Sequence, residues 1–285
     1  MIELTNACNL KCLTCSNKDM RRKKEFITDN IFNRALDECK KAQIKRLVLF
    51  TVGESFLHKN ALIYIQIAKE KGFSVSISTN AMLLDEVSLN KLFKTEIDGI
   101  QMSFSGYNKE SYEKIYIGGD FGRAIKNLRL IAELCKENGT NVRINGISLN
   151  EEHKEKTLQF LENIGFNPLV LKIRTPCNFG GKINLNKEID NGINSLIIDR
   201  KNYVMQTCNI LTNRIGIFAN GDVTACGCLD VDGEMIIGNI LKSGIKQIRE
   251  GKRYNSILNC FRKGDLSDLK MCSKCDFPYK KKASS

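Results

Sequence analysis

The sequence lacks any long apolar run, and no stretch approaches the about 18 consecutive apolar residues that a membrane-spanning helix needs. No secretory signal precedes the first cysteines, which disfavours a disulfide framework. Aromatic residues are not interleaved with basic ones in the pattern typical of nucleic-acid binding. We therefore expect a cytoplasmic protein without a membrane-spanning segment, and nucleic acid is a disfavoured partner.

The length and the charge leave several classes open. The 285 residues suit one large domain, or one domain with a small appendage. A formal net charge of +12 could indicate nucleic acid, an anionic small molecule or an acidic peptide as partner. Its local runs, Arg21 to Lys24 and Lys280 to Lys282, resemble solvated surface or tail. The charge is therefore interpreted as mainly solvated.

Cysteine is abundant. Twelve cysteines are more than packing requires in a chain of this class. In a reducing compartment such a surplus points to metal binding. The spacing of the cysteines is therefore the most informative feature of the sequence.

Three cysteines lie on one short loop near the start of the chain. Cys8, Cys12 and Cys15 follow the apolar run Met1 to Leu4, which reads as a first strand. Three thiolates can hold three corners of an iron-sulfur cube, and no fourth cysteine follows nearby, so one iron stays open. Structural zinc would favour paired C-x2-C knuckles with four ligands, and this loop supplies three.

The C-x3-C-x2-C spacing resembles the signature of the radical S-adenosylmethionine (radical SAM) superfamily. The resemblance implies a [4Fe-4S] cluster whose open iron is chelated by the amino and carboxylate groups of SAM. Transfer of an electron then cleaves SAM to a 5'-deoxyadenosyl radical. A flavodoxin or ferredoxin is the electron donor that the resemblance implies.

Strands and helices alternate along the first part of the chain. Each apolar run is followed by a stretch of helical periodicity, which predicts a parallel sheet. With the first segment counted, there are six repeats, which predict an α/β fold. The resemblance to the radical SAM superfamily implies that they form a partial (β/α)6 TIM-type barrel, with reactive groups at the carboxyl ends of the strands. The later strands are expected at 46–51, 74–79, 99–104, 142–147 and 169–173, and helices at 61–71, 85–94, 121–138 and 151–164.

Polar residues at the predicted strand ends are candidate SAM contacts. The stretch Thr51 to Ser55 resembles the Gly-Gly-Glu motif of the family, with Val52 in place of the first glycine. Thr14 stands where many members carry an aromatic residue against adenine. The resemblance places the following residues near SAM: Thr14, Gly53, Glu54, Ser78, Thr79, Asn80, Ser103, Arg143 and Asn145. Each of these side chains alone serves equally well as a strand cap.

A second informative stretch begins at Cys208. Two short β-type runs flank Asn220-Gly221, which is a strong hairpin signal because both turn positions need positive φ. The hairpin is expected to bring Cys226 back beside Cys208. A helical stretch, Ile240 to Arg262, leads to the C-x2-C pair Cys272 and Cys275.

This order of cysteines resembles the twitch domain, a shortened relative of the SPASM domain that binds one auxiliary [4Fe-4S] cluster. The resemblance implies Cys208, Cys226, Cys272 and Cys275 as ligands. Four thiolates would leave no open iron, so the auxiliary cluster would transfer electrons. A tetrahedral zinc site with the same four cysteines remains an alternative.

The other cysteines carry weaker predictions. Cys228 could replace a ligand, donate a hydrogen atom to a substrate radical, or be buried as a small hydrophobe. Cys39, Cys135 and Cys260 are expected in the core, and the role of Cys177 stays open.

The predicted organisation is a radical SAM core domain at 1–176, a loop-rich connection at 177–207, a twitch-like domain of β-hairpin plus helix at 208–278, and a basic tail at 279–285. The leading hypothesis is oxidation of a small polar metabolite, such as a sugar or an aminocyclitol. Lys172 and Arg174 are candidate bases, or candidate ligands of carboxylates or phosphates. The alternatives are radical epimerisation or crosslinking of a ribosomally made peptide, with Cys228 as hydrogen donor, and a non-catalytic zinc or cluster-bearing nucleic-acid binder.

Overall fold

The computed structural model describes residues 1–183, 203–205, 208–227 and 229–281. Cys228, most of the predicted connection (184–202 and 206–207) and the last residues of the basic tail (282–285) lie outside the described residues.

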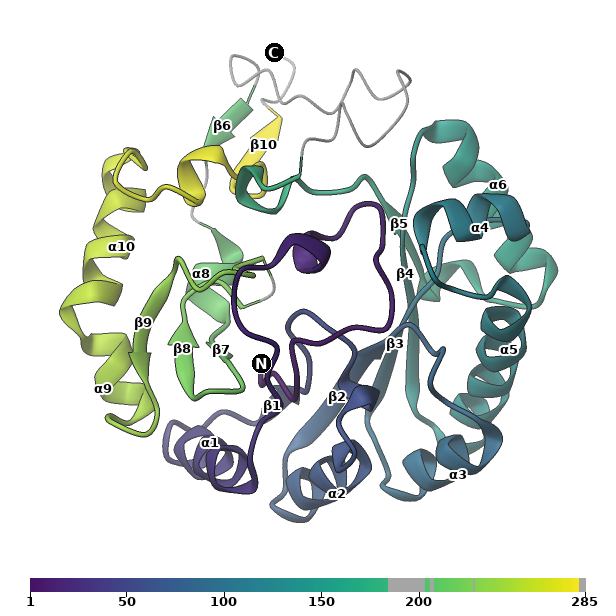
Figure 1. Cartoon of the computed structure of the whole chain (residues 1–285), viewed down its shortest axis with the longest axis horizontal. Coiled ribbons are helices and arrows are strands. Elements are labelled where there is room, and N and C mark those ends of the chain that lie inside the picture. Colours follow the sequence, from purple (N-terminus) through teal and green to yellow (C-terminus); the bar gives the residue numbers. More distant parts are fainter. Residues whose placement is uncertain (184–202, 206–207, 228, 282–285) are drawn as a thin grey trace.

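A five-stranded parallel sheet forms one half of the molecule (Figure 1). Its strands follow the order of the sequence, because each strand is followed by a helix that returns the chain to the same end of the sheet. The strands are β1 (Arg46–Val48), β2 (Ser74–Thr79), β3 (Gly99–Ser103), β4 (Asn141–Ile147) and β5 (Leu171–Arg174). The predicted α/β fold with an open barrel of parallel strands is thereby confirmed.

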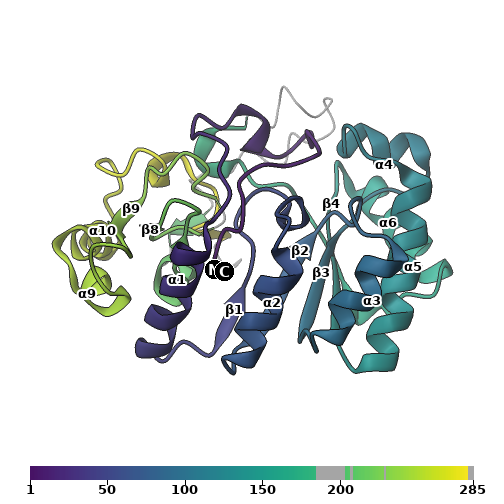
Figure 2. The same ribbon diagram turned by 60° about the horizontal axis from the view of Figure 1, so that its bottom comes forward.

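Helices cover the outer face of this sheet (Figures 1 and 2). Several begin at a side chain that accepts a hydrogen bond from the first turn, as with Thr28, Asp85 and Asp120. The helices are α1 (Asp29–Lys41), α2 (Ala61–Glu70), α3 (Glu86–Lys94), α4 (Lys109–Ile115), α5 (Phe121–Asn138) and α6 (Glu151–Asn163). Short 3-10 turns lie at Ser16–Asp19, Ser55–Leu57, Pro168–Val170 and Phe179–Gly181.

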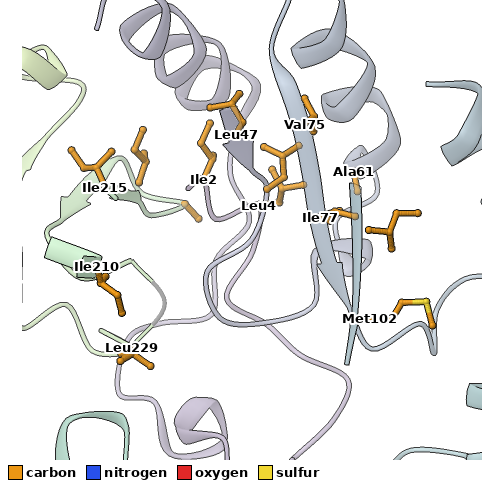
Figure 3. Close-up of a cluster of buried hydrophobic side chains, with 14 of the residues drawn as sticks. Ile2, Leu4, Leu47, Ala61, Val75, Ile77, Met102, Ile210, Ile215 and Leu229 are labelled. Atoms are coloured by element: carbon orange, nitrogen blue, oxygen red, sulfur yellow. The ribbon is translucent and has the colours of Figure 1, made fainter. Parts of the chain in front are cut away.

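The prediction of a first strand at Met1 to Leu4 is corrected. Ile2 forms only an isolated parallel bridge with Ile217. Its N–H donates to the Val48 carbonyl at 2.9 Å, and the N–H of Glu3 donates to the Ile217 carbonyl at 2.8 Å. The segment thus lies between the large sheet and the C-terminal part, and Ile2 and Leu4 belong to one apolar cluster with side chains from both (Figure 3). The large sheet therefore has five strands, not six.

The C-terminal part contains a three-stranded antiparallel sheet. The predicted hairpin is confirmed, because β7 (Gly216–Ile217) and β8 (Asp222–Thr224) flank Asn220-Gly221. The expected turn geometry is wrong, because Gly221 has a positive φ, +86°, and Asn220 does not. The other elements are α8 (Asn209–Asn213), β9 (Ile236–Asn239), α9 (Ile245–Glu250), α10 (Lys252–Lys263), a 3-10 turn at Cys272–Lys274, and the antiparallel pair β6 (Tyr203–Met205) and β10 (Tyr279–Lys281).

The single helical stretch expected over Ile240 to Arg262 is wrong in detail. It forms two helices, α9 and α10, which meet at Gly251. This glycine has extended dihedrals, φ −69° and ψ 157°, which end one helix and start the next. Glycine is a poor helix interior residue, so a break costs little there.

Candidate functional site

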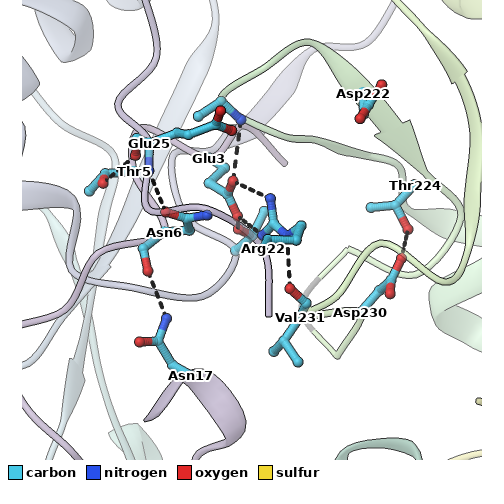
Figure 4. Close-up of polar contacts among 12 residues, drawn as sticks. Glu3, Thr5, Asn6, Asn17, Arg22, Glu25, Asp222, Thr224, Asp230 and Val231 are labelled. Carbon is cyan, nitrogen blue, oxygen red and sulfur yellow. Dashed lines mark hydrogen bonds and ion pairs between the residues drawn. The ribbon is translucent and has the colours of Figure 1, made fainter. Parts of the chain in front are cut away.

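The cysteine loop lies in the middle of the molecule, between the large sheet and the C-terminal part (Figure 1). Buried amide side chains hold its base. Asn6 donates to the Lys23 carbonyl at 2.8 Å and accepts from the Glu25 N–H at 2.8 Å. Asn17 donates to the Asn6 carbonyl at 2.8 Å (Figure 4). These bonds close the loop behind the three cysteines.

Cys8, Cys12 and Cys15 are partly buried electrostatic neighbours. Burial raises the pKa of the Cys8 thiol to about 11, and neighbouring Cys15 adds to the shift. Burial likewise raises the pKa of Cys12, to which Cys15 and Cys8 add, and the pKa of Cys15. The Lys24 ammonium acts in the opposite direction on Cys8 and Cys15. Binding to iron supplies the positive charge that buried thiolates need.

The donor set of this loop fits a cluster with one open iron. The Leu10 N–H lies 3.5 Å from the Cys8 sulfur, which is a backbone donor of the kind that tunes cluster thiolates. The Ser16 hydroxyl is buried beside Cys15 and has no hydrogen-bond partner among the described residues. Cys8, Cys12 and Cys15 would hold the SAM-binding cluster here, which supplies the electron that cleaves SAM.

The turn after β1 packs directly on the cysteine loop. The Glu54 N–H donates to the Ala7 carbonyl at 2.8 Å. Gly53 has φ +108°, and a Cβ built on it would lie 2.7 Å from the carbonyl oxygens of Thr5 and Ala7. Only glycine combines this backbone conformation with so close an approach. Gly53 therefore sets the distance between the strand end and the loop.

Glu54 and the end of β2 form one buried network. The Glu54 carboxylate accepts from the Thr79 hydroxyl at 2.9 Å and from the Asn80 N–H at 2.8 Å. Burial raises its pKa to about 7. The Asn80 amide donates to the Asn9 side chain at 2.9 Å, which ties β2 to the cysteine loop. The structure thus brings Gly53, Glu54, Thr79 and Asn80 together, with the Glu54 side chain turned into the protein.

The other predicted SAM contacts lie on the inner face of the sheet. Apolar Ile100, Met102 and Ile144 are buried on the helix side, and the residues between them alternate to the opposite face. Strand pairing places these polar residues in two rows, Ser78, Gln101 and Arg143 in one, and Ser103, Asn145 and Lys172 in the other. Thr14 is not in these rows; it is buried within the cysteine loop.

Sequence reasoning missed Gln101. Its side chain accepts a 2.7 Å hydrogen bond from the Asn145 amide across β3 and β4. The signal was available, because polar Gln101 interrupts an apolar strand at the position that alternates with Ile100 and Met102.

The four cysteines predicted for an auxiliary cluster line one cavity. They reach it from the start of α8, the end of the hairpin, and the last 3-10 turn. The remaining described lining is apolar and includes Met235 and Phe261. Burial raises the pKa of Cys272 to about 12 and that of Cys275 to about 11, and the Cys208 charge adds to both shifts. The cysteines are Cys208, Cys226, Cys272 and Cys275.

This donor set fits a cluster with four thiolate ligands. The four thiols come from separate segments around one cavity, and a cube of four irons takes its thiolates at separate corners. The Phe277 N–H lies 3.4 Å from the Cys275 sulfur, as a further backbone donor. A cluster bound here would supply one-electron transfer.

The remaining cysteines separate into two groups. Cys39 and Cys135 are buried in the apolar core as predicted. Cys260 and Cys177 are partly buried and pack against it. Cys260 is an electrostatic neighbour of Cys272 but is not among the residues that line the cavity.

The replacement of Gly53 by alanine tests the packing of the turn on the loop. We expect Gly53→Ala to lower the urea midpoint of unfolding and the iron retained per chain, because the new Cβ meets two carbonyl oxygens. Gly72 is a matched control, since its φ is +82° and nothing lies within 4 Å of the position that a Cβ would take there. Backbone strain of about 1–3 kcal/mol is common to both variants. Equal losses in the two would contradict the role of the close approach.

Comparisons with known proteins agree with this geometry. Residues 2–161 match the profile of the radical SAM superfamily, and residues 208–276 match that of the SPASM iron-sulfur cluster-binding domain. The PqqA peptide cyclase of Granulibacter bethesdensis is 31% identical over 163 residues, which are 57% of this chain and 42% of that protein. The matched part of this chain thus spans less than half the length of that relative.

Two solved structures share the fold over almost the whole chain. BtrN in complex with AdoMet and 2-DOIA covers 96% of this chain and 91% of its own, with 18% identity and a TM-score of 0.64. The structure of anSMEcpe with bound AdoMet and Cp18Cys peptide covers 96% of this chain and 87% of its own, with 16% identity and a TM-score of 0.66.

No described helix is long and apolar enough to cross a membrane.

Radical SAM enzymes with a SPASM-like domain bind SAM, the [4Fe-4S] cluster that contacts SAM, and auxiliary iron-sulfur clusters. Two sets of cysteines are available to hold these clusters, one on the N-terminal loop and one around the C-terminal cavity. The chain therefore belongs to the radical SAM superfamily and is a radical SAM enzyme with a SPASM-like C-terminal domain.

Proposed function

We propose that the protein oxidises a hydroxyl-bearing carbon of a small polar metabolite to a carbonyl. The observation that carries the proposal is the closed set of four cysteines around one apolar cavity, at Cys208, Cys226, Cys272 and Cys275. A cluster held by four thiolates has no open iron for substrate, so its use is electron transfer. The likeness to BtrN over nearly the full length of both chains supports the same architecture.

The balance of the reaction explains why a second cluster is needed. The substrate carbon gives one hydrogen atom to the 5'-deoxyadenosyl radical, its hydroxyl gives a proton to a base or water, and one electron passes to the auxiliary cluster. SAM is consumed with one electron from an external donor, and the products are 5'-deoxyadenosine, methionine and the carbonyl compound.

The residues around the cysteine loop would hold the reacting groups in place for this oxidation. In the proposal, Cys8, Cys12 and Cys15 hold the SAM-binding cluster, and Gly53, Glu54, Thr79 and Asn80 fix the loop against the strand ends. The inner face of the sheet would hold SAM through Ser78, Ser103 and Asn145 and the substrate at Arg143, with Thr14 beside the cluster.

The test is a Cys272→Ser/Cys275→Ser variant after anaerobic reconstitution. We expect iron to fall from about eight to about four per chain, because one of two four-iron clusters is lost. SAM cleavage should persist, whereas carbonyl formation from a panel of sugars, cyclitols and hydroxy acids should fall at least tenfold. The wild-type protein should form one carbonyl per 5'-deoxyadenosine.

Cys260→Ser is the matched control, because Cys260 is close to Cys272 but off the cavity lining. It should retain about eight irons per chain and full carbonyl formation. A double variant that keeps all its iron, or that forms carbonyl at the wild-type rate, would exclude the auxiliary cluster as electron acceptor.

Peptide modification is the second candidate, favoured by the 31% identity to PqqA peptide cyclase and the likeness to peptide-bound anSMEcpe. Radical epimerisation would use Cys228 as hydrogen donor. Under that function, Cys228→Ala would still cleave SAM but lose net product. A dehydrogenase in which Cys228 is merely buried would lose little.

The proposal includes the cellular setting. Iron-sulfur thiolates and an external one-electron donor require a reducing compartment, and we place the enzyme in the cytoplasm with flavodoxin or ferredoxin as donor.

A further inference from the structure

The inner face of the sheet carries three cations that lie side by side. Arg143 on β4 is exposed although β4 is flanked on both sides by other strands. A side chain at the centre of a sheet can be exposed only if that face is open. The helices cover the opposite face, so the open face is the concave one that turns toward the cysteine loop (Figure 1).

The strand register sets the spacing of these cations. Lys172 pairs with Asn145 and Arg174 pairs with Ile147 on β5 and β4. Arg143 lies two residues before Asn145, so it is the diagonal neighbour of Lys172 on the same face. Residues two apart along a strand are separated by about 6.6 Å. The three cations therefore form a continuous band from the middle of the sheet to its carboxyl end.

Among the described residues, the band has no counter-charge. No ion pair or side-chain hydrogen bond joins Arg143, Lys172 or Arg174 to a described carboxylate, whereas Lys156 and Lys182 each pair with an acidic neighbour. The neighbouring side chains within the sheet, Asn145 and Gln101, are uncharged amides, and they form a hydrogen bond with each other. Neighbouring cations without carboxylates repel one another, and a bound anion relieves this repulsion.

We propose that Arg143, Lys172 and Arg174 form the binding subsite for an anionic group, a phosphate or carboxylate, on the substrate. This inference rests on the proposed function and narrows its substrate to a hydroxyl-bearing anion, such as a sugar phosphate or a sugar acid. Arginine and lysine on a preformed sheet hold such oxygens by charge-assisted hydrogen bonds. A cationic aminocyclitol would be repelled by the same band.

The carboxylate of SAM is the competing anion. The test is therefore made with SAM present at saturation, so that its own carboxylate site is filled. The probe is inorganic phosphate, compared with chloride at equal ionic strength. Binding is measured by calorimetry on the reconstituted, non-reduced protein, in which no turnover occurs.

We expect phosphate, but not chloride, to bind, and the affinity for phosphate to fall at least tenfold in Lys172→Gln/Arg174→Gln. Lys126→Gln/Arg129→Gln removes the same charge from exposed positions on α5 and should leave phosphate binding unchanged. Arg174→Gln alone changes an exposed side chain, so its affinity for phosphate can be measured even where the double variant folds poorly.

Three results would overturn the proposal. They are equal affinity for phosphate and chloride in the wild-type protein, equal loss in both double variants, and loss of SAM affinity in place of phosphate affinity. The last result would assign the band to the SAM carboxylate. Because no turnover is measured, failure here is distinct from failure of the proposed oxidation, which shows as SAM cleavage without carbonyl product.

Discussion

Replacement of Cys8, Cys12 and Cys15 by alanine is expected to abolish 5'-deoxyadenosine formation and to lower iron from about eight to about four per chain. The three thiols are partly buried neighbours on one loop, and loss of solvation opposes their ionisation unless iron compensates the charge. The measurement is iron and sulfide per chain, together with the yield of 5'-deoxyadenosine, after anaerobic reconstitution. Loss of one entire cluster would assign the catalytic site to this loop.

Cys135→Ala is the control for this experiment. Cys135 is buried in the core, so its replacement perturbs packing without removing a proposed ligand. It should keep both the iron and the cleavage activity. About four irons in the wild-type protein and none in the triple variant, with zinc in both, would instead make the C-terminal cysteines a zinc site and remove the electron acceptor from the proposed oxidation.

The second large effect is expected from Arg22→Gln, which should destabilise the protein by about 3–5 kcal/mol, because it leaves a buried carboxylate without its partner. The two terminal guanidinium nitrogens of Arg22, Nη1 and Nη2, donate to the two carboxylate oxygens of Glu3 at 3.0 and 2.8 Å (Figure 4). The Glu3 side chain is 0% exposed and the Arg22 side chain 13% exposed. The interpretation of Arg21 to Lys24 as solvated surface is therefore wrong for Arg22. The free energy of unfolding from urea titration measures the effect.

This ion pair joins the cysteine loop to both parts of the molecule. The Glu3 carboxylate also accepts from the Thr51 hydroxyl at 2.6 Å and from the Ala219 N–H at 3.2 Å. Arg22 donates to the Val231 carbonyl at 2.7 Å, and its guanidinium carbon lies 3.7 Å from the centre of the Phe218 ring. Loss of the pair should therefore loosen the C-terminal part as well as the loop.

Arg21→Gln is the matched control one residue away. Arg21 is paired with Asp232 at 2.9 Å, but its side chain is 73% exposed. Exposed ion pairs contribute little to stability. The Asp232 carboxylate, although 6% exposed, also keeps its 2.6 Å ion pair with Lys182 when Arg21 is replaced. Similar unfolding midpoints for Arg21→Gln and Arg22→Gln would contradict the role of the buried pair. Arg22→Lys should recover only part of the loss, because lysine cannot make the two parallel bonds.

The local sequence pattern was sufficient to predict most strands of the large sheet. The strand over 74–79 and the helix over 121–138 have the predicted bounds. Their apolar residues repeat with the period of one structure, and their ends carry clear signals, such as Gly139 in the left-handed conformation after α5. The hairpin at Asn220-Gly221 was predictable for the same reason, since its turn chemistry is local.

Elements whose partners lie far along the chain were predicted poorly. The segment Met1 to Leu4 has the composition of a strand, but it pairs with Val48 on one side and Ile217 on the other, more than 200 residues away. Helices α1 and α4 were not predicted. Gln101 was missed because its importance depends on Asn145, on the neighbouring strand.

The sequence alone determined the chemistry, because three cysteines on one loop and the later cysteine set limit the metals and cofactors that can bind, whatever the fold around them. The tertiary structure decided which side chains work together. It buried Glu54 in a network that positions the loop, gathered four distant cysteines around one cavity, and aligned Arg143, Lys172 and Arg174 on an open face. Ligand type is a property of single residues, whereas burial, register and charge balance arise only when distant segments pack.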